Sequence, residues 1–420
     1  AAVALGPVLG GILLENPQWS SWLTGNDWGS VFLINVPIVI IGLFFIWRIV
    51  PETRNPHPRR LDLSGLVISA LGLILFVYGI IEASSTKDWL APSVIIPMVA
   101  GAVIIAVFLW MESRSDHASF DVHLFKNRGY SVALTAVSLS FFAMSGITFI
   151  LPFYLQVLRG YSVLQAGLLF LPVAVGQLLA APRSAGMVKR FGYKVVMTSG
   201  LVIVALVMLL LARIPMDAPL WSIIVVFFFF GYGLGNVIAP GSTVLQNVLP
   251  LARAGAGSAV QNTVRQVAGA LGVAISGTLL ANLYASNLSS ALDKVPAQFP
   301  EAAKQAATES VIAADVILDQ ALAQGVPAAV VEPLRQGAFE AFLSAAHVTS
   351  FISMGIVIIA ALVVFFLLPK ITPPERREAE AGPAQDATDA LVKEEAALYG
   401  DEAAEEYVQP SDPAEEDPRP

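Results

Sequence analysis

Cysteine is absent from the 420 residues of the chain, which excludes disulfide bonds and thiol chemistry. Histidine is rare: the spacing of His57, His117, His123 and His347 does not match a metal site, and we assign them no role. Charged residues are also scarce, at 13%, whereas 56% of residues are hydrophobic and the mean hydropathy is +0.70. A soluble domain has about a quarter charged residues, so the composition indicates a membrane protein.

Long apolar runs recur along the chain up to residue 368. Most have close to the roughly 20 residues that a helix needs to cross a bilayer, and backbone inside a bilayer is either helical or part of a closed barrel. We therefore predict an all-α integral membrane protein, a helical bundle of about ten transmembrane segments. The first run is too short to cross and begins without methionine, so we interpret it as the back half of a helix in a C-terminal fragment. The runs are 1–14, 30–47, 61–81, 92–111, 130–158, 166–181, 195–212, 220–239, 258–284 and 348–368.

Basic residues are concentrated in alternate links between these runs. Basic side chains are enriched on the cytoplasmic side of membrane proteins, so the richer set of links is predicted to be cytoplasmic, and the C-terminal tail with it. That set holds Arg48, Arg54, Arg59, Arg60, Arg114, Lys126, Arg128, Arg183, Lys189, Arg190, Lys194 and Arg253, whereas the other short links hold Lys87, Arg159 and Arg213.

The runs divide the chain into membrane helices at 1–284, a loop at 285–346, a last membrane helix at 347–368 and a tail at 369–420. The loop has helical patterns at 301–324 and 328–345, interrupted at Gly325-Val326-Pro327. We predict that it is an extracytoplasmic helical loop. The tail has fifteen acidic and five basic residues, which is typical of a disordered extension and says nothing about a substrate.

The first run contains a proline and three glycines in the order Gly6-Pro7-x-x-Gly10-Gly11. Membrane helices pack through small residues that let backbones approach, and Gly6-x-x-x-Gly10 has that spacing. Pro7 is expected to bend the helix. By itself the pattern indicates an ordinary packing face between helices.

The same Gly-Pro-x-x-Gly-Gly order resembles the antiporter motif of the major facilitator superfamily. The stretches 151–176, 257–280 and 28–38 are similar to those of its fourteen-helix drug:proton antiporters, the EmrB/QacA type. The resemblance covers 1–368 and implies a start within the family's fifth helix. It also implies a multidrug efflux transporter, associated with antibiotic resistance, that exchanges protons for amphipathic small molecules by alternating access. In such a transporter the motif seals two helices against leak, and the proton motive force replaces any cofactor.

The link at 186–194 resembles the second-half copy of a cytoplasmic loop motif of that superfamily. Gly186, Arg190, Gly192 and Lys194 match the pattern, whereas Lys189 stands where an aspartate is expected. The glycines permit a tight turn between helices. The alternative interpretation is that the cations only anchor the loop at the cytoplasmic surface.

Arg265 is a charge well inside an apolar run, and such residues are expensive in a membrane unless they have a function. It lies on a helical stripe that is expected to meet protein or a wet cavity. Two interpretations remain open: Arg265 lines a cavity, or it reaches back to the membrane surface as an anchor. Ser258 and Gln261 also have the spacing of a capping box. The stripe is Gln261, Arg265, Gly269, Gly272 and Ser276, with Asn262 and Gln266 beside it.

Other polar residues in the runs are weaker candidates for a substrate cavity. We interpret Gln156, Gln177 and Asn236 as partners in hydrogen bonds between helices rather than as ligand contacts. Ser162 and Gln165 have the spacing of a capping box at a helix start.

Paired carboxylates, metal clusters and activated nucleophiles are missing at membrane depth, so we do not expect an enzyme. The expected partners are the lipid bilayer of the bacterial cell membrane, small-molecule substrates and protons, not nucleic acid; the oligomeric state stays open. Because the runs have no acid at depth, the sequence favours neutral or anionic substrates unless an acid lies elsewhere. Transport of an endogenous metabolite or lipid, and a truncated fragment that does not transport, remain alternatives.

Overall fold

The structure, a computed structural model, describes residues 2–19, 21–49, 63–86, 88–114, 122–247, 254–292 and 301–371. The predicted acidic tail lies outside these residues from position 372 on, as do His57 and His117. The chain forms two units, Ala1–Pro369 and Lys370–Pro420, and the elements described below belong to the first.

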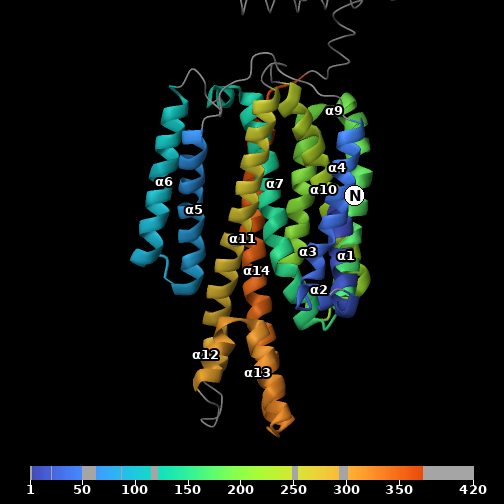
Figure 1. Cartoon of the computed structure of the whole chain (residues 1–420), viewed down its shortest axis with the longest axis vertical. Helices are drawn as coiled ribbons and strands as arrows, with labels where there is room; N and C mark the ends of the chain where they lie inside the picture. Colours follow the sequence, from blue (N-terminus) through green and yellow to red (C-terminus); the bar gives the residue numbers. More distant parts are fainter. Residues whose placement is uncertain are drawn as a thin grey trace, which may run out of the picture. The chain divides into compact units, whose positions relative to one another are not determined.

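Within the described residues every regular element is helical (Figure 1). The elements are α1 (Ala2–Glu15), η1 (Pro17–Trp19), α2 (Ser21–Thr24), α3 (Ser30–Leu33), α4 (Asn35–Ile49), α5 (Leu63–Thr86), α6 (Pro92–Glu112), η2 (Val122–Lys126), α7 (Arg128–Pro152), η3 (Phe153–Leu158), α8 (Val163–Leu169), α9 (Leu171–Leu211), α10 (Leu220–Asn247), α11 (Ala254–Leu292), α12 (Glu301–Glu309), α13 (Val311–Ala323) and α14 (Ala328–Leu367).

Eight helical segments of the described residues are long and apolar enough to cross a membrane. One of them, Val163–Leu211, has 49 residues, which is more than twice the roughly 20 that one crossing needs. It is interrupted at Gly192, whose φ of 82° and ψ of 161° are not helical. Because a positive φ is easy only for glycine, Gly192 makes the turn between two crossings. With the shorter apolar helix Gly6–Glu15, the described part of the chain has ten apolar helical segments, as the hydropathy predicts.

Glycines allow α9 and α10 to approach closely. A Cβ at Gly231 would overlap the carbonyl oxygen of Val173, and one at Gly200 would lie 2.7 Å from the carbonyl oxygen of Gly233. A Cβ at Gly235 would meet Ala180. Membrane helices lack a hydrophobic drive to associate and depend on such close backbone packing.

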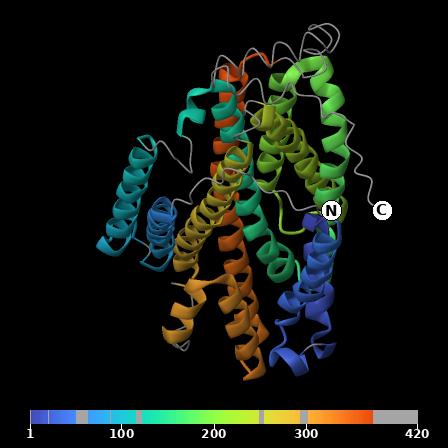
Figure 2. The same cartoon turned by 45° about the horizontal axis from the view of Figure 1, so that its top comes forward.

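Helices α5 and α6 lie side by side as a hairpin (Figure 2). They touch through Gly101, where a Cβ would overlap the backbone of Phe76. The hairpin is joined to α11 by one buried hydrogen bond, in which Thr278 Oγ1 donates to the carbonyl oxygen of Ile80 at 3.1 Å. This bond places α5 beside the middle of α11.

Helix α7 begins at Asn127, whose side chain accepts from the N–H groups of Gly129 and Tyr130. Its C-terminal end passes at Pro152 into the π-helical turn η3. Helix α8 begins at the predicted capping box: Ser162 accepts from the N–H of Gln165, and the Gln165 side chain accepts from the N–H of Ser162. That prediction is confirmed.

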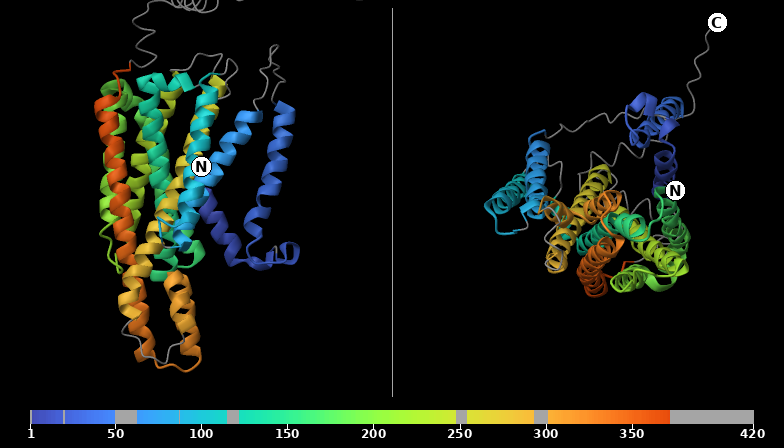
Figure 3. Two further views of the ribbon diagram at one scale, coloured as in Figure 1. Left: turned by 90° about the vertical axis from the view of Figure 1, so that its left-hand side faces the viewer. Right: turned by 90° about the horizontal axis from the view of Figure 1, so that it is seen from below.

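Helices α11 and α14, of 39 and 40 residues, continue without a break through positions 284 and 347, where the sequence predicts membrane segments to end and begin. Helices α12 and α13 lie at one end of this pair (Figures 1 and 3). The predicted interruption occurs at Gly325, whose φ is 88°. The described part of 285–346 is therefore helical and consists of the ends of α11 and α14 together with α12 and α13.

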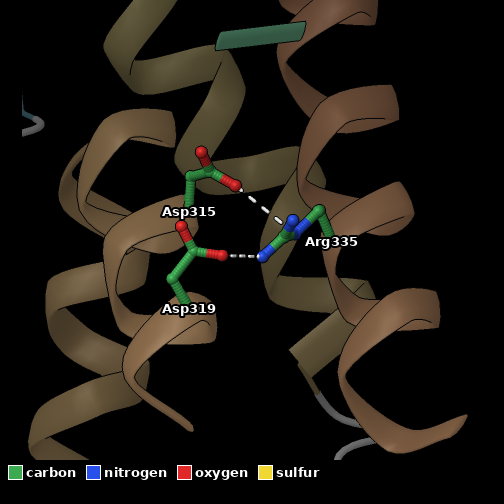
Figure 4. A network of polar contacts seen from close by, with 3 residues as sticks. All are labelled: Asp315, Asp319 and Arg335. Carbon is green, nitrogen blue, oxygen red and sulfur yellow. Dashed lines mark hydrogen bonds and ion pairs between the residues drawn. The ribbon is translucent and has the colours of Figure 1, made fainter. Parts of the chain in front are cut away.

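Helices α13 and α14 form a helical hairpin, and Arg335 of α14 connects its two helices (Figure 4). Its Nε lies 3.4 Å from Asp315 Oδ1, and its Nη2 donates to Asp319 Oδ1. Both aspartates are on α13, one turn apart. Burial raises the pKa of the Asp315 carboxyl above its ordinary value, and the positive charge of Arg335 opposes that rise. Burial thus disfavours the charged form of Asp315, and the positive charge of Arg335 partly compensates for this cost.

The turn between α9 and α10 is held by three side chains from other elements. Arg159 Nη1 donates to the carbonyl oxygens of Met216, at 2.9 Å, and Ala218, at 2.7 Å. Tyr154 Oη donates to the carbonyl oxygen of Pro215, and His347 Nε2 lies 2.8 Å from that of Ile214. His347, to which the sequence assigns no role, therefore ties α14 to this turn.

Candidate functional site

The polar stripe of α11 faces α7. A Cβ at Gly272 would overlap the carbonyl oxygen of Phe142, and one at Gly269 would lie 3.0 Å from Ser145 Oγ. Ser276 is 2% exposed and lies against Gly146 of α7. The prediction that this face of the helix meets protein is confirmed.

Arg265 is half-buried on the same face. Its guanidinium carbon lies 4.2 Å from the ring centroid of Phe141 on α7, which is a cation–π contact. Its Nε is buried and has no hydrogen-bond partner among the described residues. The guanidinium is therefore in contact with protein, and one of its donors is left for a further partner.

Gln261 connects α11 with α10. The side chain is 7% exposed, and its Nε2 donates to Ser242 Oγ at 3.2 Å. Helix α11 begins at Ala254, four residues before Ser258, so the predicted capping box of Ser258 and Gln261 is wrong. A long apolar helix places Ser258 in its second turn, where the N–H groups already have partners.

The remaining candidate residues are not brought together. Asn236 is 1% exposed, and its Nδ2 donates to the carbonyl oxygen of Tyr232 in its own helix, so the predicted bond between helices is wrong. Gln156 lies in the π-turn η3, while Asn262 and Gln266 are exposed on α11. None of the six predicted cavity residues lines either of the two cavities described below.

The Gly-Pro-x-x-Gly-Gly motif crosses the start of α8. A Cβ at Gly11 would lie 2.7 Å from Leu164 Cα, and one at Gly167 would lie 2.5 Å from the carbonyl oxygen of Pro7. A Cβ at Gly6 or Gly10 would meet no atom of the described residues within 4 Å. The motif is at a helix crossing, but the expectation that Gly10 makes the contact is wrong, because the helix turns Gly11 toward α8.

Glu15, one turn after Gly11, caps α8. Its Oε1 accepts from the N–H of Leu164 at 3.2 Å, in the first turn of α8. First-turn N–H groups have no partner within the helix, and the positive end of the helix dipole favours a carboxylate. The sequence does not reveal this contact because 149 positions separate the two residues.

In the 186–194 motif, Gly192 makes the turn described above, whereas Gly186 is exposed within α9. The Arg190 guanidinium carbon lies 5.2 Å from the Phe191 ring centroid, and Lys194 Nζ lies 5.6 Å from that of Phe365 on α14. Both cations therefore rest on aromatic rings near the turn. The structure thus shows the predicted turn at Gly192 and one cation–π contact for each of Arg190 and Lys194.

Two of the cavities between the described helices are relevant to a ligand site. One, of about 730 Å³, is formed by the beginnings of α8, α9 and α10, with Tyr161 and Gln165 as its polar lining residues. The other, of about 650 Å³, lies among α5, α7, α11, α14 and the junction of α12 with α13. Its lining includes Phe149, Phe153, Tyr284, Glu309 and Phe342. The sequence does not indicate this group, because it comes from five elements that meet only in the folded chain.

Among the described residues, one acidic side chain is buried at the end of a membrane-length helix. Glu112, the last residue of α6, is 3% exposed. The apolar run in the sequence ends at residue 111, one position before Glu112, so hydropathy does not indicate this residue. It lies at the end of the segment rather than at membrane depth.

Comparison with known proteins shows similarity over most of the chain. The model of the Major Facilitator Superfamily matches residues 1–273. The multidrug efflux pump LfrA of Mycolicibacterium smegmatis is 31% identical over 364 residues, which are 87% of this chain and 68% of LfrA. The multidrug resistance protein Stp of Mycobacterium tuberculosis is 30% identical over 291 residues, 69% of this chain and 52% of Stp. The lincomycin resistance protein LmrB of Listeria innocua is 26% identical over 281 residues, 66% of this chain and 57% of LmrB. The chain thus spans little more than half the length of the last two.

Proposed function

The chain belongs to the Major Facilitator Superfamily, and on that premise we propose that it exports amphipathic small molecules, drugs among them, in exchange for protons across the bacterial cell membrane. The observation that carries the proposal is the similarity to LfrA over 87% of the chain. The similarity to Stp and LmrB supports the same class of substrate. The protein is a multi-pass membrane protein, and its helices are the moving parts of a transporter that exposes its site to the two sides in turn.

The α1–α8 crossing has the properties of a seal in such a transporter. Gly11 and Gly167 bring two backbones into contact, and Glu15 fixes the first turn of α8. Close backbone contact leaves no room for water between the helices. In this proposal the contact prevents leak of protons or substrate along the α1–α8 boundary.

Proton exchange requires a group that can carry a proton. Within the described residues, Glu112 is the buried acidic side chain and the last residue of the membrane-length helix α6, and ionisable groups buried in or at the end of such helices are functional candidates. We assign Glu112 as the candidate proton site of this chain. Arg265, in contact with Phe141 and with one free donor, is the candidate for a substrate or positioning contact.

An efflux assay tests this function. The complete gene product is expressed in a drug-sensitive bacterial host, the cells are loaded with a chemically varied set of fluorescent compounds, and efflux is followed with and without a proton uncoupler. We expect efflux of several amphipathic compounds, lost on uncoupling. The matched control is the Gly11→Leu variant, present in the membrane in the same amount as the wild type. Efflux that persists without a proton gradient would contradict the antiport mechanism, and no efflux of any compound would contradict the substrate class.

A further inference from the structure

The cavity of about 650 Å³ has an aromatic wall. The ring centroids of Phe149 and Phe153 are 5.4 Å apart, and those of Phe153 and Phe342 are 6.0 Å apart, so three rings from α7, η3 and α14 form one continuous surface. Helix α11 contributes small residues to the same lining. These are Ala270, Ala274, Gly277 and Ala281.

The small residues of α11 are what keep the cavity open. A Cβ at Gly277 would already lie 3.2 Å from the ring of Phe149, so a larger residue there would fill the space. Val77 and Ile81 of α5 close another side of the cavity. The hydrogen bond from Thr278 to Ile80 holds α5 in that position.

The cavity is closed at one end by the junction of α12 with α13. Tyr284, which is 2% exposed, donates from its hydroxyl to the carbonyl oxygen of Ala307 at 3.0 Å and so fastens α12 to α11. The next lining residues along the chain are Glu309, Ser310 and Val311. Figure 1 shows α12 and α13 at the end of α11 and α14.

Glu309, which is exposed, is the charged residue of this lining. No basic side chain of the described residues forms an ion pair with it. It is also the last residue of α12, where the helix dipole adds negative potential. The cavity thus has an unneutralised carboxylate at one end and aromatic faces along its wall.

We propose that this cavity binds amphipathic organic cations, with the charged group at Glu309 and the apolar body against Phe149, Phe153 and Phe342. Aromatic faces attract cations, and a volume of 300 to 1,000 Å³ is usual for a site of drug size. The carboxylate comes from the α12–α13 junction rather than from a membrane segment, which explains how a chain without an acid at membrane depth can select cations. This inference rests on the proposed export function and names a substrate class for it.

Binding of a cation and of a neutral compound of similar shape tests the site. The complete gene product is purified in lipid nanodiscs, and the Kd values of tetraphenylphosphonium and of neutral triphenylphosphine oxide are measured. In the Glu309→Gln variant we expect the Kd of the cation to rise about three- to fivefold, because Glu309 is exposed and an exposed charge pair contributes at most about 1 kcal/mol. The Kd of the neutral compound should change less than twofold. Glu332→Gln, which changes an exposed carboxylate of α14 outside the cavity, is the matched control and should bind both compounds as the wild type does.

A second variant tests the aromatic part of the cavity. Ala270 is exposed and lines the cavity, so Ala270→Phe adds bulk there without a clash in the core and should weaken binding of both compounds severalfold. An unchanged affinity for the cation in both Glu309→Gln and Ala270→Phe, or no binding of the cation by the wild type, would overturn the site. Binding is measured without transport, so the two proposals are tested separately. Absence of efflux would contradict the proposed export function, whereas the Kd values alone show whether the cavity binds cations.

Discussion

Gly11 of α1 lies against Leu164 of α8, so close that a Cβ on the glycine would be 2.7 Å from Leu164 Cα. One residue earlier, a Cβ on Gly10 would have no atom of the described residues of other elements within 4 Å. Of these two neighbouring glycines, Gly11 therefore contacts α8 and Gly10 does not. Variants at the two positions can be compared to test the α1–α8 crossing.

The first prediction concerns this crossing. Gly11→Leu should reduce efflux at least tenfold at equal membrane level, because the side chain forces α1 and α8 apart, and overpacking of this kind costs about 1 to 3 kcal/mol. Gly10→Leu should keep most of the activity. Equal loss in the two variants would show that the crossing seen here does not carry the effect.

The second prediction concerns the contact of Arg265 with Phe141. Arg265→Lys keeps the charge but loses the planar group with five donors, so we expect efflux to fall about three- to tenfold. A residue that only reaches the membrane surface would tolerate lysine, because the lysine stem is also long enough.

A double-mutant cycle with Phe141→Leu identifies the contact. If the ring and the guanidinium act together, the double variant should lose little more than either single variant. Efflux at the wild-type level in Arg265→Lys would leave the anchor interpretation standing.

The third prediction concerns Glu112 of α6. Glu112→Gln cannot bind and release a proton, so efflux driven by a proton gradient should fall at least tenfold, while binding of the substrate should change little. The comparison is Glu82→Gln, which changes a partly exposed glutamate near the end of α5. Proton uptake into vesicles during drug efflux is the direct measurement, and normal uptake in Glu112→Gln would remove the residue from the mechanism.

The fourth prediction concerns Arg335 and its pH dependence. Because burial raises the pKa of Asp315 above its value in the unfolded chain, the charged carboxylate disfavours the folded hairpin above that folded pKa, and the cost disappears as the pH falls through it. Arg335→Met removes the compensating charge. Amides of α13 should then exchange hydrogen up to about fivefold faster at neutral pH, since an exposed ion pair contributes about 1 kcal/mol or less, and the difference should shrink in acid. A difference that is the same at both pH values would contradict this origin.

The fifth prediction concerns orientation in the membrane. Because the chain has no cysteine, single cysteines can be labelled without a background. A membrane-impermeant reagent should label Gln324→Cys, at the exposed end of α13, in intact cells, and should reach Gly186→Cys only after the membrane is opened. The reverse pattern would invert the topology that the basic residues predict.

Local patterns in the sequence were sufficient for much of the fold. Apolar runs predicted the membrane-length helices, Ser162 and Gln165 predicted the start of α8, and the glycines of the 186–194 stretch predicted the turn that occurs at Gly192. Each of these features depends on the residue itself and on neighbours within one or two helical turns. Hydropathy, capping and a positive φ can therefore be predicted before any packing is known.

The tertiary structure alone decided which of these residues meet. Gly11 rather than Gly10 touches α8, Gln261 bonds to Ser242 rather than capping its own helix, and Glu309 closes a cavity with aromatic rings from distant helices. Adjacent residues of a helix point about 100° apart, so a small rotation of the helix selects a different contact. That rotation is set by packing against segments far away in the chain, and no pattern within a single run encodes it.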